Sequence, residues 1–200
     1  MTAAIGPLWL AALQEIVDRA AHELKDSLNG VSLNLEVIRS RSTRDGVTGK
    51  DLKDFAEAAL GQFEALNGRV EALLALARSP RVATTGADVA VILKQLATLL
   101  VPAAKADGRT LQVEGEERGI PTGAPPLSVR LAIAAGLLTL VKGESGGRCL
   151  LEGGPEPVVR FSHESAVTCS LDSAVADALP DSNIRHRRSG NDLLIVFPGP

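Results

Sequence analysis

The residues of this chain that could do chemistry gather around His22, in the run His22-Glu23-Leu24-Lys25-Asp26-Ser27-Leu28-Asn29. Apolar residues recur through this stretch in steps of three and four, at positions 10, 13, 17, 20, 24, 28, 31, 35 and 38. That spacing predicts an amphipathic helix packed in a bundle. Because each helical residue turns by about 100°, His22 faces away from the apolar seam. An exposed imidazole on a rigid helix, next to a carboxylate, is suited to accept and release a phosphoryl group.

Charged neighbours of His22 would tune this chemistry. We expect the carboxylate of Glu23 to accept a hydrogen bond from one ring nitrogen, which leaves the other nitrogen as the nucleophile. Lys25 would attract the phosphoryl group, and Asp26 and Asn29 would support the site. The alternative is that His22 and these neighbours are solvated surface side chains with no role in catalysis.

A surface stripe continues from His22 along the same helix. In steps of three and four it consists of Asp26, Asn29, Leu33 and Val37. Gly30 flanks it in mid-helix, where glycine costs about 1 kcal/mol relative to alanine, which indicates a close approach by another group. We expect Asp26, Asn29, Gly30, Leu33 and Val37 to form a docking surface for a partner helix. The alternative is contact with the second domain of the same chain.

The composition limits the possible functions. The 200 residues are 45% hydrophobic with a formal net charge of −3, which gives no reason to expect nucleic-acid binding. The basic cluster 185–188 is expected to be the solvated face of a strand. Cys149 and Cys169 have no zinc-ligand spacing and are expected to be buried free thiols. With no basic leader and no apolar run long enough to cross a bilayer, we expect a cytoplasmic protein that contacts no membrane.

The first 80 residues predict two helices. The first runs from about Pro7 to Arg41, and the second from an N-cap at Thr48, with Asp51 in its first turn, to about Arg78. Their apolar seams have matched spacing and are joined by the short turn 42–47, which predicts an antiparallel hairpin. Two helices cannot bury such seams alone. We therefore expect residues 1–80 to pair with a second copy as a dimeric four-helix bundle.

The rest of the chain has a different pattern. Ser79-Pro80 ends the second helix and residues 81–86 form a linker. Residues 86–200 then interleave helices with short strands, and Pro102 is expected to kink or end the first of these helices. The expected helices begin at 88, 127 and 172, and the expected strands are 110–114, 149–152, 158–162, 183–188 and 193–197. Helices interleaved with mostly antiparallel strands predict a two-layer α/β sandwich.

This order of parts resembles a bacterial sensor histidine kinase core. Kinases of that family carry a phosphoacceptor box on the first helix of a dimeric hairpin, and His22, Glu23, Lys25 and Leu28 match it. Ser27 stands where proline is usual, and Asp26 where threonine or asparagine is usual. The resemblance implies that residues 86–200 correspond to the kinase ATP-binding domain.

The kinase nucleotide motifs are missing. Ala135 and Thr139 stand where the family has magnesium-binding asparagines, and neither the Asp-x-Gly-x-Gly loop nor the second glycine-rich loop is present. Phosphate cradles need bare backbone N–H groups, and magnesium needs oxygen ligands. We therefore expect a degenerate ATPase-like domain that binds no cofactor. A histidine box without an ATP site resembles the histidine phosphotransferases of bacterial phosphorelays.

The sequence thus predicts a homodimeric phosphotransferase that moves a phosphoryl group between receiver-domain aspartates through a phosphohistidine, without ATP. The partners would be response-regulator receiver domains, which would supply Mg²⁺ in their own acidic pockets. One alternative is a non-catalytic dimeric adaptor or pseudokinase that binds response regulators or kinases. A further alternative is a histidine kinase with an atypical nucleotide site.

Overall fold

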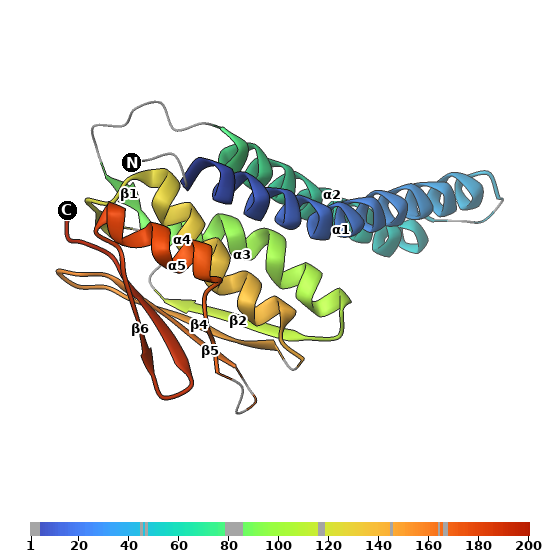
Figure 1. Cartoon of the computed structure of the whole chain (residues 1–200). Helices are drawn as coiled ribbons and strands as arrows, with labels where there is room; N and C mark the ends of the chain where they lie inside the picture. Colours follow the sequence, from blue (N-terminus) through green and yellow to red (C-terminus); the bar gives the residue numbers. More distant parts are fainter. Residues whose placement is uncertain are drawn as a thin grey trace.

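The computed structural model describes residues 5–44, 46, 48–78, 86–115, 119–144, 146–163, 165 and 168–200. Two long helices, α1 (Ile5–Ser42) and α2 (Gly49–Ala77), form an antiparallel hairpin, and an α/β region with a mixed sheet follows (Figure 1). The predicted class, a helical hairpin followed by an α/β sandwich, is confirmed. The residues predicted to end the second helix, Ser79-Pro80, lie outside the described residues. So does nearly all of the predicted linker, up to residue 85.

The second helix begins where the sequence places its cap. Thr48 is the N-cap of α2, and the carboxylate of Asp51 accepts hydrogen bonds from its backbone N–H at 2.9 Å and from its hydroxyl at 2.7 Å. These bonds hold the pKa of Asp51 below its usual range, with the backbone bond as the larger cause. The capping box satisfies donors that a helix start would otherwise leave unpaired.

The α/β region is built on a five-stranded sheet in the order β2-β4-β5-β7-β6. Its strands are β2 (Thr110–Gly115), β4 (Gly146–Glu152), β5 (Val158–His163), β6 (Arg185–Ser189) and β7 (Asp192–Val196). The edge strand β2 pairs with β4 in parallel, and the other three pairings are antiparallel. Two short strands, β1 (Ala87–Asp88) and β3 (Pro121–Thr122), form a separate pair that the sequence did not predict. The basic cluster lies on β6 and is exposed, as expected.

One face of the sheet is covered by helices, as Figure 1 shows. They are α3 (Val89–Ala106), α4 (Pro126–Lys142) and α5 (Ser173–Ala178), followed by the 3₁₀ turn η1 (Leu179–Ser182). Asp88 and Asp172 cap α3 and α5 by accepting from backbone N–H groups. Gly136 lets α4 approach the sheet, because a Cβ there would lie 2.4 Å from the ring of Phe161. The two cysteines are buried free thiols, as predicted.

The prediction that Pro102 kinks or ends its helix is wrong, because α3 continues through Pro102 to Ala106. A proline inside a helix costs about 3 kcal/mol. Both sides of Pro102 are anchored in the core, where Leu99, Leu100 and Ala104 are almost fully buried. Each buried leucine contributes about 1.5–3 kcal/mol, so the packing of α3 on both sides of Pro102 offsets the lost hydrogen bond.

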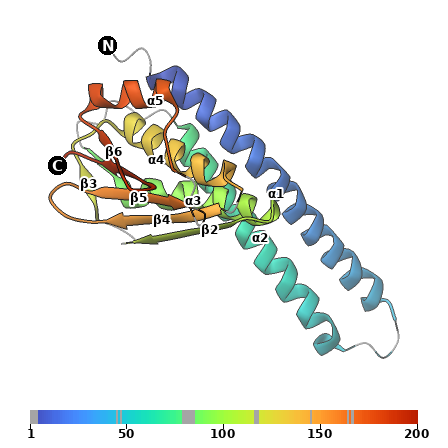
Figure 2. The ribbon, with the colours of Figure 1, turned by 60° about the horizontal axis from the view of Figure 1, so that its bottom comes forward.

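A single hydrophobic core joins the base of the hairpin to the α/β region. Ile5, Trp9 and Ile16 of α1 and Leu76 of α2 are buried in the same cluster as the inner faces of α3, α4 and the sheet. From α4, the guanidinium of Arg130 donates to the carbonyl oxygens of Ala75, Leu76 and Arg78 at the end of α2. Figure 2 shows the far ends of α1 and α2 projecting beyond the helices and the sheet. The hairpin therefore has a buried base and a projecting end.

Helix α3 corrects the prediction that no apolar run in the sequence is long enough to cross a bilayer. In the part of the chain that the structure describes, it is the one helix whose length and composition would allow a membrane crossing, with a mean hydropathy of 1.5. Half of that helix is buried inside the protein, where it packs on the sheet.

Candidate functional site

His22 lies on the outer face of α1, and its side chain is 76% exposed. Its Nε2 atom is 3.5 Å from Oδ2 of Asp26, one turn further along the helix. The expected hydrogen bond from the imidazole to Glu23 is not formed. The physical reason is helical geometry: adjacent residues diverge by about 100°, whereas residues four apart lie about 40° apart on the same face. Asp26 is therefore the carboxylate that can orient the imidazole in this structure.

The remaining polar residues of the predicted site share this open face. Lys25, Asp26 and Asn29 are exposed, and Lys25 forms no ion pair with any residue that the structure describes. Glu23 is half-buried at the edge of the face. The structure thus brings the imidazole, one ammonium and one carboxylate onto a solvent-facing patch of a rigid helix.

The close approach predicted at Gly30 comes from within the hairpin. A Cβ on Gly30 would lie 2.5 Å from the amide nitrogen of Gln62 on α2. The amide of Asn34 donates to the carbonyl oxygen of Gly30 at 3.0 Å and to Oε1 of Gln62 at 3.2 Å. The close approach that Gly30 permits is therefore that of Gln62 on α2, and a role for Gly30 in partner binding stays a prediction.

The two aliphatic residues of the predicted docking stripe differ in exposure. Leu33 is 64% exposed and lies only about 20° round the helix from His22, so a protein that reaches the imidazole would also meet this leucine. Val37 is half-buried. The alternative that Leu33 and Val37 contact the second domain gains no support from Figure 2, where this end of the hairpin projects away from the α/β region.

A second exposed apolar surface runs along the opposite side of the hairpin. Val17, Leu28 and Leu35 lie about 220–240° round α1 from His22 and are exposed. On α2 the exposed large apolar residues are Leu60, Phe63, Val70 and Leu74. These seven residues, here called the seam face, belong largely to the seams that predicted pairing with a second copy.

The position expected for a nucleotide is a hollow whose charged side chains and Thr139 already have partners within this chain. A hollow of about 580 Å³ lies between α1, α4 and residues 170–175, and both Ala135 and Thr139 line it. The Thr139 hydroxyl lies 2.9 Å from the carbonyl oxygen of Ala135 and 3.2 Å from that of Ser170. Lys142, the cation of this hollow, is paired with Glu15 of α1 at 2.9 Å. The described residues that line the hollow therefore leave no unpaired cation to hold phosphates.

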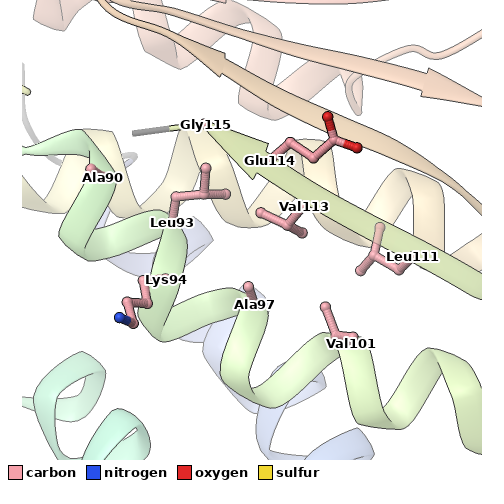
Figure 3. A pocket seen from close by; sticks show the side chains of 9 residues that line it. All are labelled: Ala90, Leu93, Lys94, Ala97, Val101, Leu111, Val113, Glu114 and Gly115. Carbon is pink, nitrogen blue, oxygen red and sulfur yellow. The ribbon is translucent and has the colours of Figure 1, made fainter. Parts of the chain in front are cut away.

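Another pocket lies between α3 and the edge strand β2, where Figure 3 shows Leu93, Leu111 and Val113 lining the space between helix and strand. Its charged residues are Lys94 and Glu114, and Glu114 is paired with Arg148. The described residues that line this pocket include no histidine or cysteine and none of the predicted site residues. Among the described residues, no group of three or more histidine, cysteine, aspartate or glutamate side chains could hold a metal ion.

Sequence reasoning missed Arg69, which lies next to the predicted site. Its Nη1 donates to the carbonyl oxygen of Glu23 at 3.3 Å and to the hydroxyl of Ser27. Arg69 is more than 40 residues away from both in the chain. The sequence contains no signal for this contact, because Arg69 lies outside the apolar seam of α2, as a solvated helix residue would.

Comparisons with known proteins show similarity to solved structures only. No protein-family model matches the sequence, and no curated protein matches it. Full-length ShkA in complex with AMPPNP has a TM-score of 0.44 and 14% identity, with 93% of this chain covered. The histidine kinase AdeS of Acinetobacter baumannii has a TM-score of 0.36 and 14% identity, with 89% of this chain and 98% of AdeS covered. The chain spans 46% of the length of ShkA.

Proposed function

We propose that this protein is an ATP-independent histidine phosphotransferase that exchanges a phosphoryl group with the aspartates of receiver domains. The observation that carries the proposal is the placement of His22, whose exposed imidazole lies on the middle of a rigid helix with a carboxylate one turn away. The seam face lies on the other side of the hairpin, so pairing through it would leave the His22 face open to a partner. A receiver domain can therefore reach the imidazole without rearrangement of the fold.

The transfer needs few groups from this chain. A ring nitrogen of neutral His22 forms a bond to phosphorus with its lone pair, and the bond between phosphorus and the aspartyl oxygen breaks, so that the aspartate leaves as a carboxylate. The other ring nitrogen keeps its proton, and a carboxylate such as that of Asp26 stabilises the resulting positive charge. The reverse step delivers the group to a second receiver. Magnesium held by the receiver's own acidic residues would neutralise charge on the phosphoryl oxygens.

Dimerisation is part of the proposal. The seam face exposes seven large apolar side chains along both helices, and exposed apolar surface of this extent marks an interaction site. Pairing two hairpins through it would form a four-helix bundle with a His22 on each outer side.

Independence from ATP is supported by the hollow at Ala135 and Thr139. A magnesium nucleotide needs amide or carboxylate oxygens on that face of α4 and free donors for its phosphates. Helix α4 offers a methyl group, a hydroxyl that already lies against two carbonyl oxygens, and a lysine paired with Glu15. The other carboxylate of the hollow, Asp172, accepts a hydrogen bond from the backbone N–H of Ala174 as the cap of α5. A kinase with an atypical nucleotide site would have to bind ATP elsewhere.

The experiment is a transfer assay with a panel of purified receiver domains that have been phosphorylated with acetyl phosphate. We expect phosphate to move from at least one receiver to this protein and on to another, and His22→Ala to abolish the transfer. His186→Ala is the matched control, because His186 is also exposed but lies on β6. Transfer that survives His22→Ala would rule out His22 as the acceptor. Binding without transfer would indicate an adaptor, and phosphorylation from ATP alone would indicate a kinase.

A further inference from the structure

A hollow of about 570 Å³ adjoins the phosphoacceptor region, between the hairpin and the C-terminal half of α3. Its lining residues are Glu23, Arg69, Val101, Pro102, Lys105 and Ala106. Glu23 lies about 100° round α1 from His22 and is half-buried, so the hollow opens at the edge of the face that carries the imidazole. Its wall on α3 is formed by apolar and basic residues that the predicted site did not include.

Three charged side chains face this hollow without pairing with one another. Arg69 donates to a backbone carbonyl oxygen and a hydroxyl, and none of the described residues offers it a carboxylate. Lys105 and Glu23 form no ion pair within the described part of the chain either. Two cations and one carboxylate leave the hollow with an excess positive charge.

On the neighbouring surface of α1, in contrast, the charged side chains at the contact with α3 are paired. One turn before His22, Arg19 pairs with Glu15 at 3.2 Å and with Asp107 at 3.5 Å, which links α1 to the residue that follows α3. Charges that only stabilise the contact between the hairpin and α3 are thus paired. The unpaired guanidinium and ammonium at the hollow are available to an anionic group from outside.

We propose that this hollow receives the acidic rim of a receiver's phosphorylation site, with Arg69 and Lys105 as positioning residues. The proposal rests on the function proposed above. A phosphorylated receiver presents an aspartyl phosphate surrounded by acidic side chains, and positive charge beside His22 attracts and orients such a surface. Arg69 is the fixed member, because two hydrogen bonds hold its guanidinium against α1. Lys105 is exposed and can follow the partner.

The test compares variants of two lysines on the same helix. Lys105→Gln removes the proposed contact, Lys105→Arg keeps the charge, and Lys94→Gln is the matched control, because Lys94 is also exposed and without an ion pair. Arg69→Gln is a supporting variant. Its thermal stability is measured as well, because Arg69 also joins α1 to α2. Single-turnover transfer is measured against receiver concentration, and affinity is measured separately with a beryllofluoride-loaded receiver.

We expect Lys105→Gln to raise the half-saturating receiver concentration about two- to fivefold, the range for an exposed ion pair, with the maximal rate unchanged. Lys105→Arg should restore it, Lys94→Gln should have no effect, and added salt should weaken the wild type more than Lys105→Gln. Equal half-saturation for wild type and Lys105→Gln, or an equal loss in Lys94→Gln, would overturn the proposal. If the receiver binds but no transfer occurs, the proposed function fails, and the affinities of the two lysine variants still decide whether the hollow is the docking site.

Discussion

His22 and Asp26 lie one helical turn apart on α1, with Nε2 of the imidazole 3.5 Å from Oδ2 of the carboxylate. Both side chains are more than half exposed, so the contact orients the ring without contributing much to stability. With Nε2 facing Asp26, the other ring nitrogen points away from the carboxylate. In this geometry Asp26, and not its sequence neighbour Glu23, is the carboxylate within reach of the imidazole.

Asp26→Asn should slow phosphoryl transfer more than Glu23→Gln does. Loss of the orienting charge is expected to lower the maximal rate about two- to fivefold, in line with an exposed ion pair. Single-turnover rates at saturating receiver concentration would measure this. A larger loss in Glu23→Gln would show that the imidazole turns toward Glu23 when the receiver binds, and would refute the assignment to Asp26.

Phe63→Glu should convert the protein from a dimer to a monomer. Phe63 is 48% exposed on the seam face, and a charge buried there on pairing would cost about 2 kcal/mol or more, roughly thirtyfold in the dissociation constant. Light scattering at micromolar concentration measures the mass, and circular dichroism should show that the hairpin remains helical. A monomeric wild type would refute the proposed dimer.

Leu33→Asp provides the complementary experiment on the His22 face. It should leave the dimer intact and weaken receiver binding about fivefold or more, because Leu33 would be an exposed apolar contact that desolvates on docking. Fluorescence anisotropy with a labelled receiver gives the affinity. Unchanged affinity in Leu33→Asp would place the docking surface elsewhere on the hairpin.

Arg130→Gln should destabilise the junction between the hairpin and the α/β region. The guanidinium donates to three carbonyl oxygens at the end of α2, and hydrogen bonds from a charged donor contribute about 1.5–3 kcal/mol each, with partial replacement by glutamine. Burial lowers the pKa of Arg130, and the same burial makes it costly to leave the three carbonyl oxygens without a donor. Urea unfolding should show a clearly reduced midpoint. Arg44→Gln, at the projecting end of the hairpin, serves as the control.

The capping box of α2 predicts a pH dependence. Hydrogen bonds from Thr48 lower the pKa of Asp51 in the folded state, so this carboxylate stabilises the fold above its unfolded pKa of about 3.9. That contribution is lost as pH falls through the folded pKa. Asp51→Asn should lower the melting temperature at pH 7, and its difference from the wild type should shrink as pH falls through the folded pKa of Asp51. Asp54→Asn, three residues beyond Asp51 and outside the capping box, is the matched control.

Local chemistry made the helices predictable. The boundaries at Thr48, Asp88 and Asp172 coincide with side chains that cap in the structure, and the hairpin follows from apolar spacing. The pair β1 and β3 was missed because two residues are too few to show alternation. Pro102 was misjudged because local propensity ignores burial, which holds α3 in the core before the proline through Leu100 and after it through Ala104.

The site was only partly predictable for a related reason. Exposure of His22 follows from its angle on the helix, which the sequence contains. The partners of its surroundings come from distant segments: Gln62 fills the space over Gly30, and Arg69 reaches Glu23 and Ser27. Such contacts depend on the register of α1 against α2, which apolar spacing does not specify to within one side chain.

The buried base and projecting end of the hairpin imply a gradient of local unfolding along its length. Trp9 and Ile16 are held in the core, whereas near the far end the packing includes only half-buried side chains such as Phe55, whose ring lies 4.6 Å below the guanidinium of Arg41. Backbone amides should therefore exchange with solvent slowly near the base and progressively faster toward residues 42 and 49. His22 lies between the slowly and the rapidly exchanging parts of α1. Local unfolding of the helix around it does not require the core to unfold. A bound receiver would slow exchange there and leave the base unchanged.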